Sequence, residues 1–116
     1  MAYTTRIDIL RPREVESRYN PGDYTLDYDD PEVIPVPMRV SLQPVASKEQ
    51  ADGRMSVVTG WLLSTPVGVD IDLRSTDRVR AKGRVLSVLG DVLRFPHPIK
   101  PTGVHHVEAS LEEVTG

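Results

Sequence analysis

The chain has 116 residues, which is the size of a single domain, and it contains no cysteine, so disulfide bonds and thiolate metal sites are excluded. The net charge of −3 differs from the basic balance typical of nucleic-acid-binding proteins, and only 5% of the residues are aromatic. The N-terminus lacks a signal-peptide pattern, and no apolar run approaches the ~20 residues of a membrane span. We therefore expect a soluble, unsecreted protein with no membrane partner.

Short β-strands are predicted from the N-terminus onward. Residues 4–11 alternate, with Ile7 and Ile9 on one face, and Pro12 is expected to end this strand because proline lacks the ladder donor. Residues 13–35 then form a long polar segment, which contains the turn sequence Asn20-Pro21-Gly22-Asp23. Connections of this length with little regular structure tend to be functional, so we expect an extended arm that orders on a partner.

The middle of the chain predicts two strands around a projecting loop. Residues 36–43 place Met38, Val40 and Leu42 on one face. Residues 44–54 are polar and rich in breakers, which favours a mobile excursion from the body. Residues 55–65 carry apolar side chains on both faces, which is typical of a central strand.

The last third predicts a hairpin and a final strand. Residues 77–89 form the hairpin around the two-residue turn Lys82-Gly83 and are closed by Gly90, residues 91–103 are irregular, and residues 104–113 alternate again. The prediction for the whole chain is one all-β domain over residues 1–116, a small SH3-like or OB-like barrel of five to six strands with long inter-strand loops.

No constellation of residues indicates catalysis or a cofactor. Neighbouring His105 and His106 are expected on opposite faces of a strand, which is poor geometry for joint metal ligation. Asp70 and Asp72 are expected to be solvent-exposed, and Pro31 interrupts the acidic run that begins at Asp27, so no calcium-loop spacing results. We expect a protein that is not an enzyme and that uses no metal or cofactor.

An ordered series of short motifs runs through nearly the whole chain. It consists of Ile7 to Pro12, Gly22-Asp23, Asp27 to Pro31, Val40 to Pro44, Glu49, Asp52-Gly53-Arg54, Val57 to Gly60, Pro66, Asp77-Arg78-Val79, Lys82-Gly83, Val88 to Gly90, Pro98, Gly103 and the closing strand. In this order the motifs resemble the head-to-tail stopper proteins of siphophages, especially those of actinobacterial phages.

The resemblance implies a virion protein of the phage neck, assembled in the host cytoplasm. Such proteins form a ring, usually of twelve copies, beneath the portal and adaptor rings. The ring closes the channel after DNA packaging, lets double-stranded DNA pass later, and receives the tail terminator. The family's channel-facing gate maps here to residues 44–54, with the candidate gating residues Pro44, Lys48, Glu49, Gln50, Asp52, Gly53 and Arg54. This version of the loop is short.

Two polar groups are the candidates for inter-subunit or partner docking. One lies in the arm, and the other is a dense run of basic residues around the Lys82-Gly83 turn. Their members are Tyr24, Asp27, Tyr28, Asp29 and Asp30, and Arg78, Arg80 and Arg84. A cationic run suits an acidic partner or DNA phosphates, whereas a solvated hairpin tip explains it equally well.

Two other interpretations remain open from the sequence. One is another neck or tail component of similar design, such as a hexameric tail terminator. The other is an SH3-like or OB-like nucleic-acid-binding module, which the acidic balance and the lack of a stripe of stacking aromatics disfavour.

Overall fold

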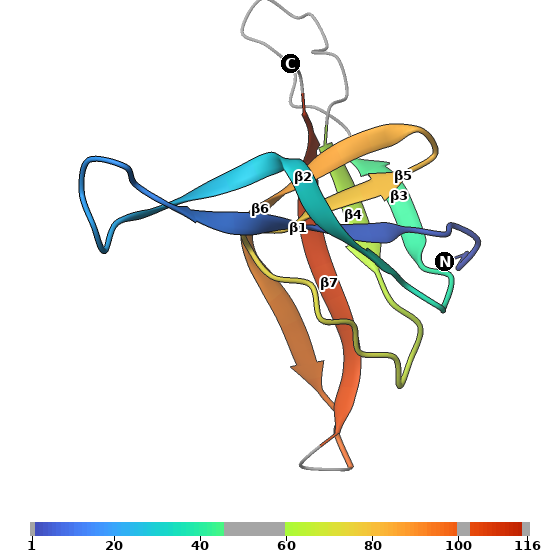
Figure 1. Ribbon diagram of the computed structural model, residues 1–116. Helices are drawn as coiled ribbons and strands as arrows, with labels where there is room; N and C mark the ends of the chain where they lie inside the picture. Colours follow the sequence, from blue (N-terminus) through green and yellow to red (C-terminus); the bar gives the residue numbers. More distant parts are fainter. Residues whose placement is uncertain (1, 46–59, 100–102, 115–116) are drawn as a thin grey trace, which may run out of the picture.

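The computed structural model describes residues 2–45, 60–99 and 103–114, and it confirms the all-β prediction (Figure 1). The described residues form seven strands and no helix. The strands are β1 (Asp8–Glu16), β2 (Tyr24–Pro35), β3 (Ser41–Val45), β4 (Gly60–Ser64), β5 (Arg78–Ala81), β6 (Arg84–Pro96) and β7 (Val104–Glu113). None of the described residues builds the long apolar helix that a membrane crossing would need.

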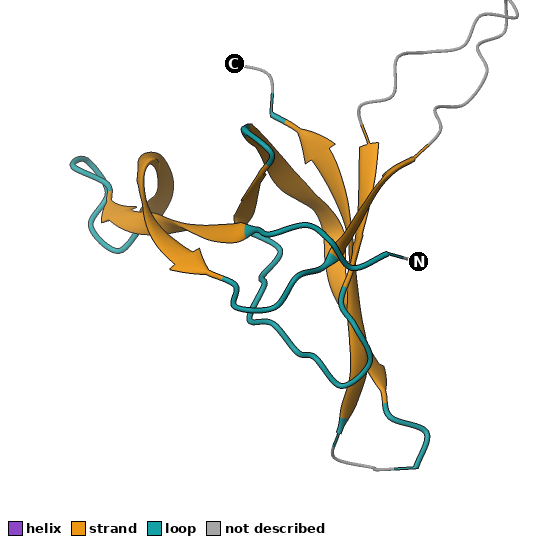
Figure 2. Cartoon of the chain, turned by 90° about the vertical axis from the view of Figure 1, so that its right-hand side faces the viewer, coloured by secondary structure: helices purple, strands orange, loops and turns teal. Residues whose placement is uncertain are grey.

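All seven strands belong to one antiparallel sheet with the order β2-β1-β5-β6-β7-β4-β3. The sheet curls, as Figure 2 shows from the side. Thr5 and Val40 exchange two backbone hydrogen bonds of 3.0 and 2.9 Å, which join the segment before β1 to the segment before β3. The strands from β1 to β3 are thereby connected into a barrel-like ring, and β2 lies outside it.

The core fills the inside of this ring. It is made almost entirely of aliphatic side chains, as the composition predicts: Ile7, Ile9, Val36, Val40, Leu63, Ile71, Leu73, Val79, Ala81, Leu86, Val107, Ala109 and Leu111. Full burial of a large aliphatic side chain stabilises a fold by roughly 1.5–3 kcal/mol, so this cluster is the main source of the domain's stability.

The predicted end of the first strand at Pro12 is wrong. Strand β1 continues to Glu16, and its pairing with β2 shifts register between Arg11 and Arg13. Pro12 sits at that irregularity, where a missing backbone donor breaks no ladder bond. Residues 13–35 are consequently a regular β-hairpin rather than a connection with little structure.

The second strand is displaced toward the C-terminus. Val40 is fully buried, whereas Met38, which was predicted on the same face, is half exposed and lies before β3. Strand β3 instead includes Pro44, which the sequence assigned to a loop. Because β3 is the last strand in the sheet order, proline is tolerated there. Of the predicted third strand, residues 60–64 form β4, which pairs on both sides, and residues 55–59 lie outside the described part.

In the last third of the chain, the structure confirms two predictions and contradicts one. The Lys82-Gly83 turn has φ angles of 52° and 75°, as a two-residue hairpin turn requires, and β7 spans the predicted residues 104–113. Gly90 does not close the hairpin. It adopts a φ of 69° at an irregularity of the β6–β7 ladder, and β6 continues through it to Pro96. Residues 91–96 are therefore strand and lengthen β6. The strand that raises the count above the predicted five to six is β2, in the segment expected to be a connection.

Candidate assembly surface

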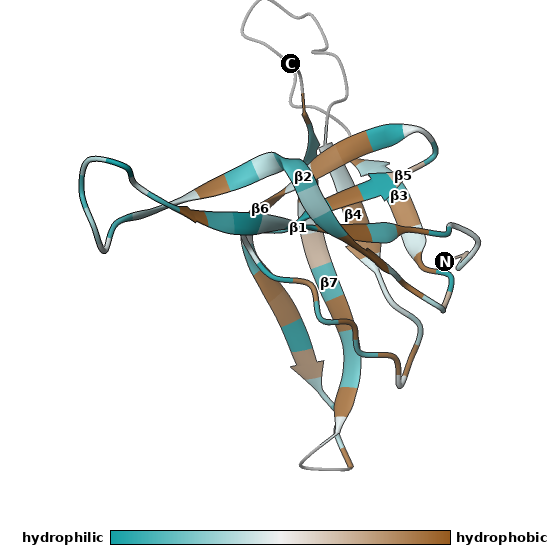
Figure 3. Cartoon of the chain, in the orientation of Figure 1, coloured by the Kyte–Doolittle hydropathy of each residue, from teal (hydrophilic) through white to brown (hydrophobic). Residues whose placement is uncertain are grey.

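The β1–β2 hairpin forms an arm, residues 13–35, that projects from the barrel (Figure 1). Its outer half pairs Arg13 with Asp27 and Glu16 with Tyr24. Figure 3 shows hydrophilic colours at its tip, but apolar side chains also lie open along it: Val15, Tyr19, Tyr24 and Leu26 are 46%, 86%, 60% and 42% exposed. A two-stranded hairpin is marginally stable alone in water, so these side chains are suited to contact with a partner.

Polar contacts within the tip fix its shape. The Ser17 hydroxyl accepts hydrogen bonds from the backbone N–H groups of Tyr19 and Asn20 at 3.4 and 3.3 Å. The Asp23 N–H donates to the Asn20 carbonyl at 3.0 Å, and Gly22 takes a φ of 96° that glycine adopts without strain. The turn predicted from Asn20-Pro21-Gly22-Asp23 is confirmed, and it presents Tyr19 from an ordered loop.

Tyr28 and Arg78 bring the two groups of predicted docking residues together at the base of the arm. The Arg78 guanidinium lies 3.8 Å from the centroid of the Tyr28 ring, and the Tyr28 hydroxyl donates to the Thr76 carbonyl at 2.7 Å. This cation–π contact stabilises the junction of β2 with β5. It also forms one wall of a pocket of about 320 Å³ lined by Leu10, Tyr28, Pro31, Arg78, Val85 and Val114.

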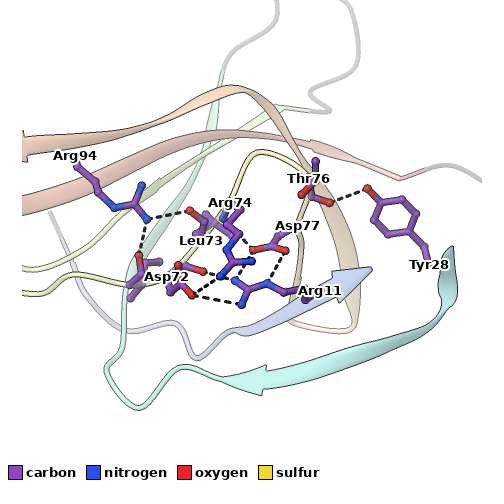
Figure 4. A network of polar contacts seen from close by, with 9 residues as sticks. Arg11, Tyr28, Asp72, Leu73, Arg74, Thr76, Asp77 and Arg94 are labelled. Atoms are coloured by element: carbon purple, nitrogen blue, oxygen red, sulfur yellow. Dashed lines mark hydrogen bonds and ion pairs between the residues drawn. The ribbon is translucent and has the colours of Figure 1, made fainter. Parts of the chain in front are cut away.

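A second polar network attaches the arm to the barrel beside this pocket (Figure 4). Arg11 of β1 donates to both carboxylate oxygens of Asp77, at 3.2 and 3.0 Å, and the Asp77 side chain is fully buried. Asp77 also accepts the backbone N–H of Arg74 at 2.9 Å. Because two parallel donors fix the orientation of a carboxylate, this bidentate pair holds the start of the arm against the turn that precedes β5.

Asp72 adds a more exposed carboxylate to the same network. It contacts Arg11 and Arg74 at 3.3 Å each, with 70% of its side chain exposed. The hydrogen bonding that Arg11 donates to the Asp77 carboxylate is the main cause that raises the pKa of Arg11 above its ordinary value. Burial acts to raise the pKa of Asp72. The charges of Arg74 and Arg11 and the hydrogen bonds from both arginines lower it by more, so the pKa of Asp72 lies below its ordinary value of 3.8.

Arg94 of β6 holds the segment 70–73 from the opposite side. It donates to the carbonyls of Ile71 and Leu73 at 2.9 and 3.0 Å and pairs with Asp70 at 3.3 Å. Asp70 and Asp72 are both more than half exposed, which confirms the expectation that they are solvated. The open groove beside them has a volume of about 890 Å³, and arginine contacts tie both carboxylates to the fold.

Two other arginines around the Lys82-Gly83 turn pair with acidic side chains of the same chain. Arg80 contacts Asp8 at 3.0 Å, and Arg84 contacts Glu113 at 2.7 Å. Arg80 lies on the outer face of β5, where it alternates with buried Val79 and Ala81. These pairs reduce the positive charge that the sequence suggested for this hairpin and leave Arg78 as the member that joins the arm.

The predicted channel loop lies mostly outside the described residues. Pro44 belongs to β3, where it pairs with Trp61. Lys48, Glu49, Gln50, Asp52, Gly53 and Arg54 fall in the part of the chain that the structure does not describe.

The histidines correct one geometric expectation. His105 and His106 are not on opposite faces, because their Nδ1 atoms lie 2.7 Å apart and their rings meet edge to face. The β6–β7 register shifts between Phe95 and Pro96, which leaves His105 as an extra residue and turns it toward its neighbour. Within residues 2–45, 60–99 and 103–114, no group of three or more His, Asp or Glu side chains is placed to hold a metal ion.

Sequence reasoning missed Arg11, Asp77 and Arg94. Arg11 and Asp77 are 66 positions apart, and no local pattern links them. The only signal was an aspartate placed just before a strand, which is a common turn residue. Their importance follows from the antiparallel pairing of β1 with β5, which the sequence pattern did not specify.

The fold resembles two solved structures across nearly the whole chain. One is protein SF1141 from Shigella flexneri 2a, with a TM-score of 0.55 and 18% identity over 96% of this chain and 92% of that protein. The other is protein xkdH of the phage-like element PBSX from Bacillus subtilis, with a TM-score of 0.51 and 18% identity over 94% and 92%. No protein-family model and no curated protein matches the sequence.

Proposed function

We propose that this protein is a structural component of a phage neck, a head-to-tail stopper that forms a ring below the portal and adaptor. In this role the ring closes the channel after DNA packaging and receives the tail terminator. The observation that carries the proposal is the end-to-end likeness of its fold to xkdH, a protein of a phage-like element. The series of motifs shared with siphophage stoppers supports it independently.

The surface of the molecule is consistent with assembly into a larger structure. A hairpin arm with open apolar side chains projects from a small barrel, and two polar networks fix its base. In the proposed ring, Tyr24, Asp27, Tyr28, Asp29 and Asp30 of the arm contact neighbouring subunits or the adaptor. Arg78 supports that surface from β5, while Arg80 and Arg84 serve mainly to hold the barrel together.

A nucleic-acid-binding module is disfavoured by the same contacts. Arg80 and Arg84 pair with carboxylates of the chain, and Arg78 lies over Tyr28, so these cations are not arranged as a free phosphate-binding stripe. A submicromolar, salt-dependent affinity of the purified protein for DNA would reverse this conclusion.

The direct test blocks production of the protein during infection by its source phage. The particles are then imaged by electron microscopy. We expect DNA-filled heads that leak their genome, beside complete tails that remain unattached. Joined virions of normal appearance would refute the proposal, and headless tails of uncontrolled length would indicate a tail terminator instead.

A further inference from the structure

We propose that the tip of the arm, residues 17–22, docks into the Tyr28–Arg78 pocket of a second copy of this chain. The contact is head-to-tail, because the donated tip and the receiving pocket are different surfaces of the same molecule. Repetition of such a contact closes into a ring when the rotation between copies allows it. This inference deepens the proposed function and rests on it for the closure of the ring.

The tip has the composition and order of a binding anchor. Tyr19 is the most exposed of the described large hydrophobic side chains, at 86%, and Arg18 beside it is exposed as well. Tyrosine and arginine are the residue types most often found at the energetic centres of protein interfaces. Because Ser17 and Asn20 already hold the turn, little conformational entropy remains to be lost on docking.

The pocket offers a matching environment. Leu10, Val85 and Val114 give it apolar walls, and the Arg78 guanidinium, already stacked on Tyr28, presents a planar cation to an incoming ring. At about 320 Å³ it accommodates one aromatic side chain with part of the adjoining turn.

Charge complementarity favours the same pairing. Arg18 is the charged residue within residues 17–22, and Glu16 next to the tip accepts the Gly22 N–H at 3.3 Å. The stretch of β2 that supplies Tyr28 and Pro31 to the pocket carries Asp27, Asp29, Asp30 and Glu32. Asp30 contacts Arg13 at 3.8 Å. The Asp27 carboxylate accepts the Asp29 N–H at 2.9 Å. In the part of the chain that the structure describes, no lysine or arginine lies within ion-pair distance of Asp27 or Asp29, so both can pair with Arg18 of a neighbour.

The tip of the arm cannot reach the Tyr28–Arg78 pocket of its own molecule. Residues 11–16 extend along β1, which places Glu16 about 17 Å beyond Arg11 at the usual rise per residue, and Tyr19 lies in the turn beyond Glu16. The arm points away from the barrel in Figure 1, and the pocket lies where the arm begins. Only another molecule can bring residues 17–22 to this site.

Disulfide trapping in the cysteine-free chain tests this contact directly. Asn20→Cys places a thiol beside Tyr19, and Val85→Cys places one in the pocket wall. The two sites of one molecule are much farther apart than the ~7 Å limit for a disulfide, so any bond formed joins two copies. The purified double variant is oxidised at high concentration and analysed on a non-reducing gel. We expect a ladder of covalent dimers and larger species.

A matched variant and a mutation in the anchor complete the test. Asn20→Cys with Val67→Cys, on an exposed loop outside the pocket, is expected to give no ladder. Adding Tyr19→Ala to the pocket pair is expected to reduce the yield of the ladder by about tenfold. Absence of a ladder with Val85→Cys, or an equal ladder with Val67→Cys, would overturn this contact. The proposed neck function would survive that result, because it is decided separately by the particles formed without the protein.

Discussion

Strand β1 runs through two different environments. Its first half lies in the barrel wall, where Ile9 and Leu10 are buried, and its second half lies in the arm, where Val15 is 46% exposed. The change occurs at the irregularity between Arg11 and Arg13. On one side the aliphatic side chains are used to fold the chain, and on the other side they remain open to a partner. The same strand therefore couples the stability of the barrel to the position of the proposed docking surface.

The largest effect is expected from truncation of a core side chain. Leu63 is fully buried between β3 and β7, so Leu63→Ala should lower the free energy of unfolding by about 2–5 kcal/mol. Leu26→Ala removes the same atoms from the arm, where the side chain is 42% exposed, and should cost less than about 1 kcal/mol. Urea unfolding of both variants measures the difference. Similar losses at the two positions would show that the arm folds against the barrel.

The barrel was more predictable than the arm because its pattern is local. Alternation along residues 104–113 and the glycine of the Lys82-Gly83 turn each specify a structure within a few positions. Alternation likewise predicts Ile7 and Ile9 on one strand face, and both are buried. In contrast, the sequence predicts strand ends at Pro12 and Gly90, since both residues usually interrupt a ladder. Their actual position at register irregularities depends on the partner strand.

The sequence predicted which residues belong to the proposed docking surface, but not which of them contact one another. Tyr28 and Arg78 were both selected from the sequence, but their contact across 50 positions depends on β1 lying between β2 and β5. The same topology places Arg11 against Asp77, and no spacing rule brings together residues of non-consecutive strands. Sequence patterns thus identify which residues are available for contact, while sheet order decides which of them meet.

The next largest effect is expected at the junction between barrel and arm. Asp77→Asn removes the charge that binds Arg11 and weakens the contact with the Arg74 N–H, so it should cost about 2 kcal/mol of stability. Asp8→Asn breaks the exposed pair with Arg80 and should cost less than about 1 kcal/mol. Thermal unfolding of the two variants makes the comparison. An equal cost would mean that the buried pair contributes no more than a surface pair.

A smaller effect is expected from acid at the same junction. The pKa of Asp72 in the folded protein lies below its ordinary 3.8. Its carboxylate therefore contributes stability at pH values above 3.8, and this contribution is lost as the pH falls through the lower folded value. Urea midpoints of the wild type and Asp72→Asn should differ at pH 5 and converge toward pH 2. A constant difference across this range would exclude the ion pairs with Arg11 and Arg74 as its source.

The smallest effect is expected at a turn of the barrel. Lys82 has a φ of 52°, a left-handed conformation that asparagine adopts more readily than lysine, so Lys82→Asn should stabilise the fold by about 0.5 kcal/mol. Lys82→Ala removes the same charge but lacks the short polar side chain that helps asparagine adopt this conformation, so it should give no gain. Because β5 and β6 both pair within the barrel, the gain should appear in global unfolding. Equal stabilisation by Lys82→Ala would show that the gain comes from the lost charge. Stabilisation by Lys82→Asn alone would show that the backbone conformation at this turn contributes to the stability of the barrel.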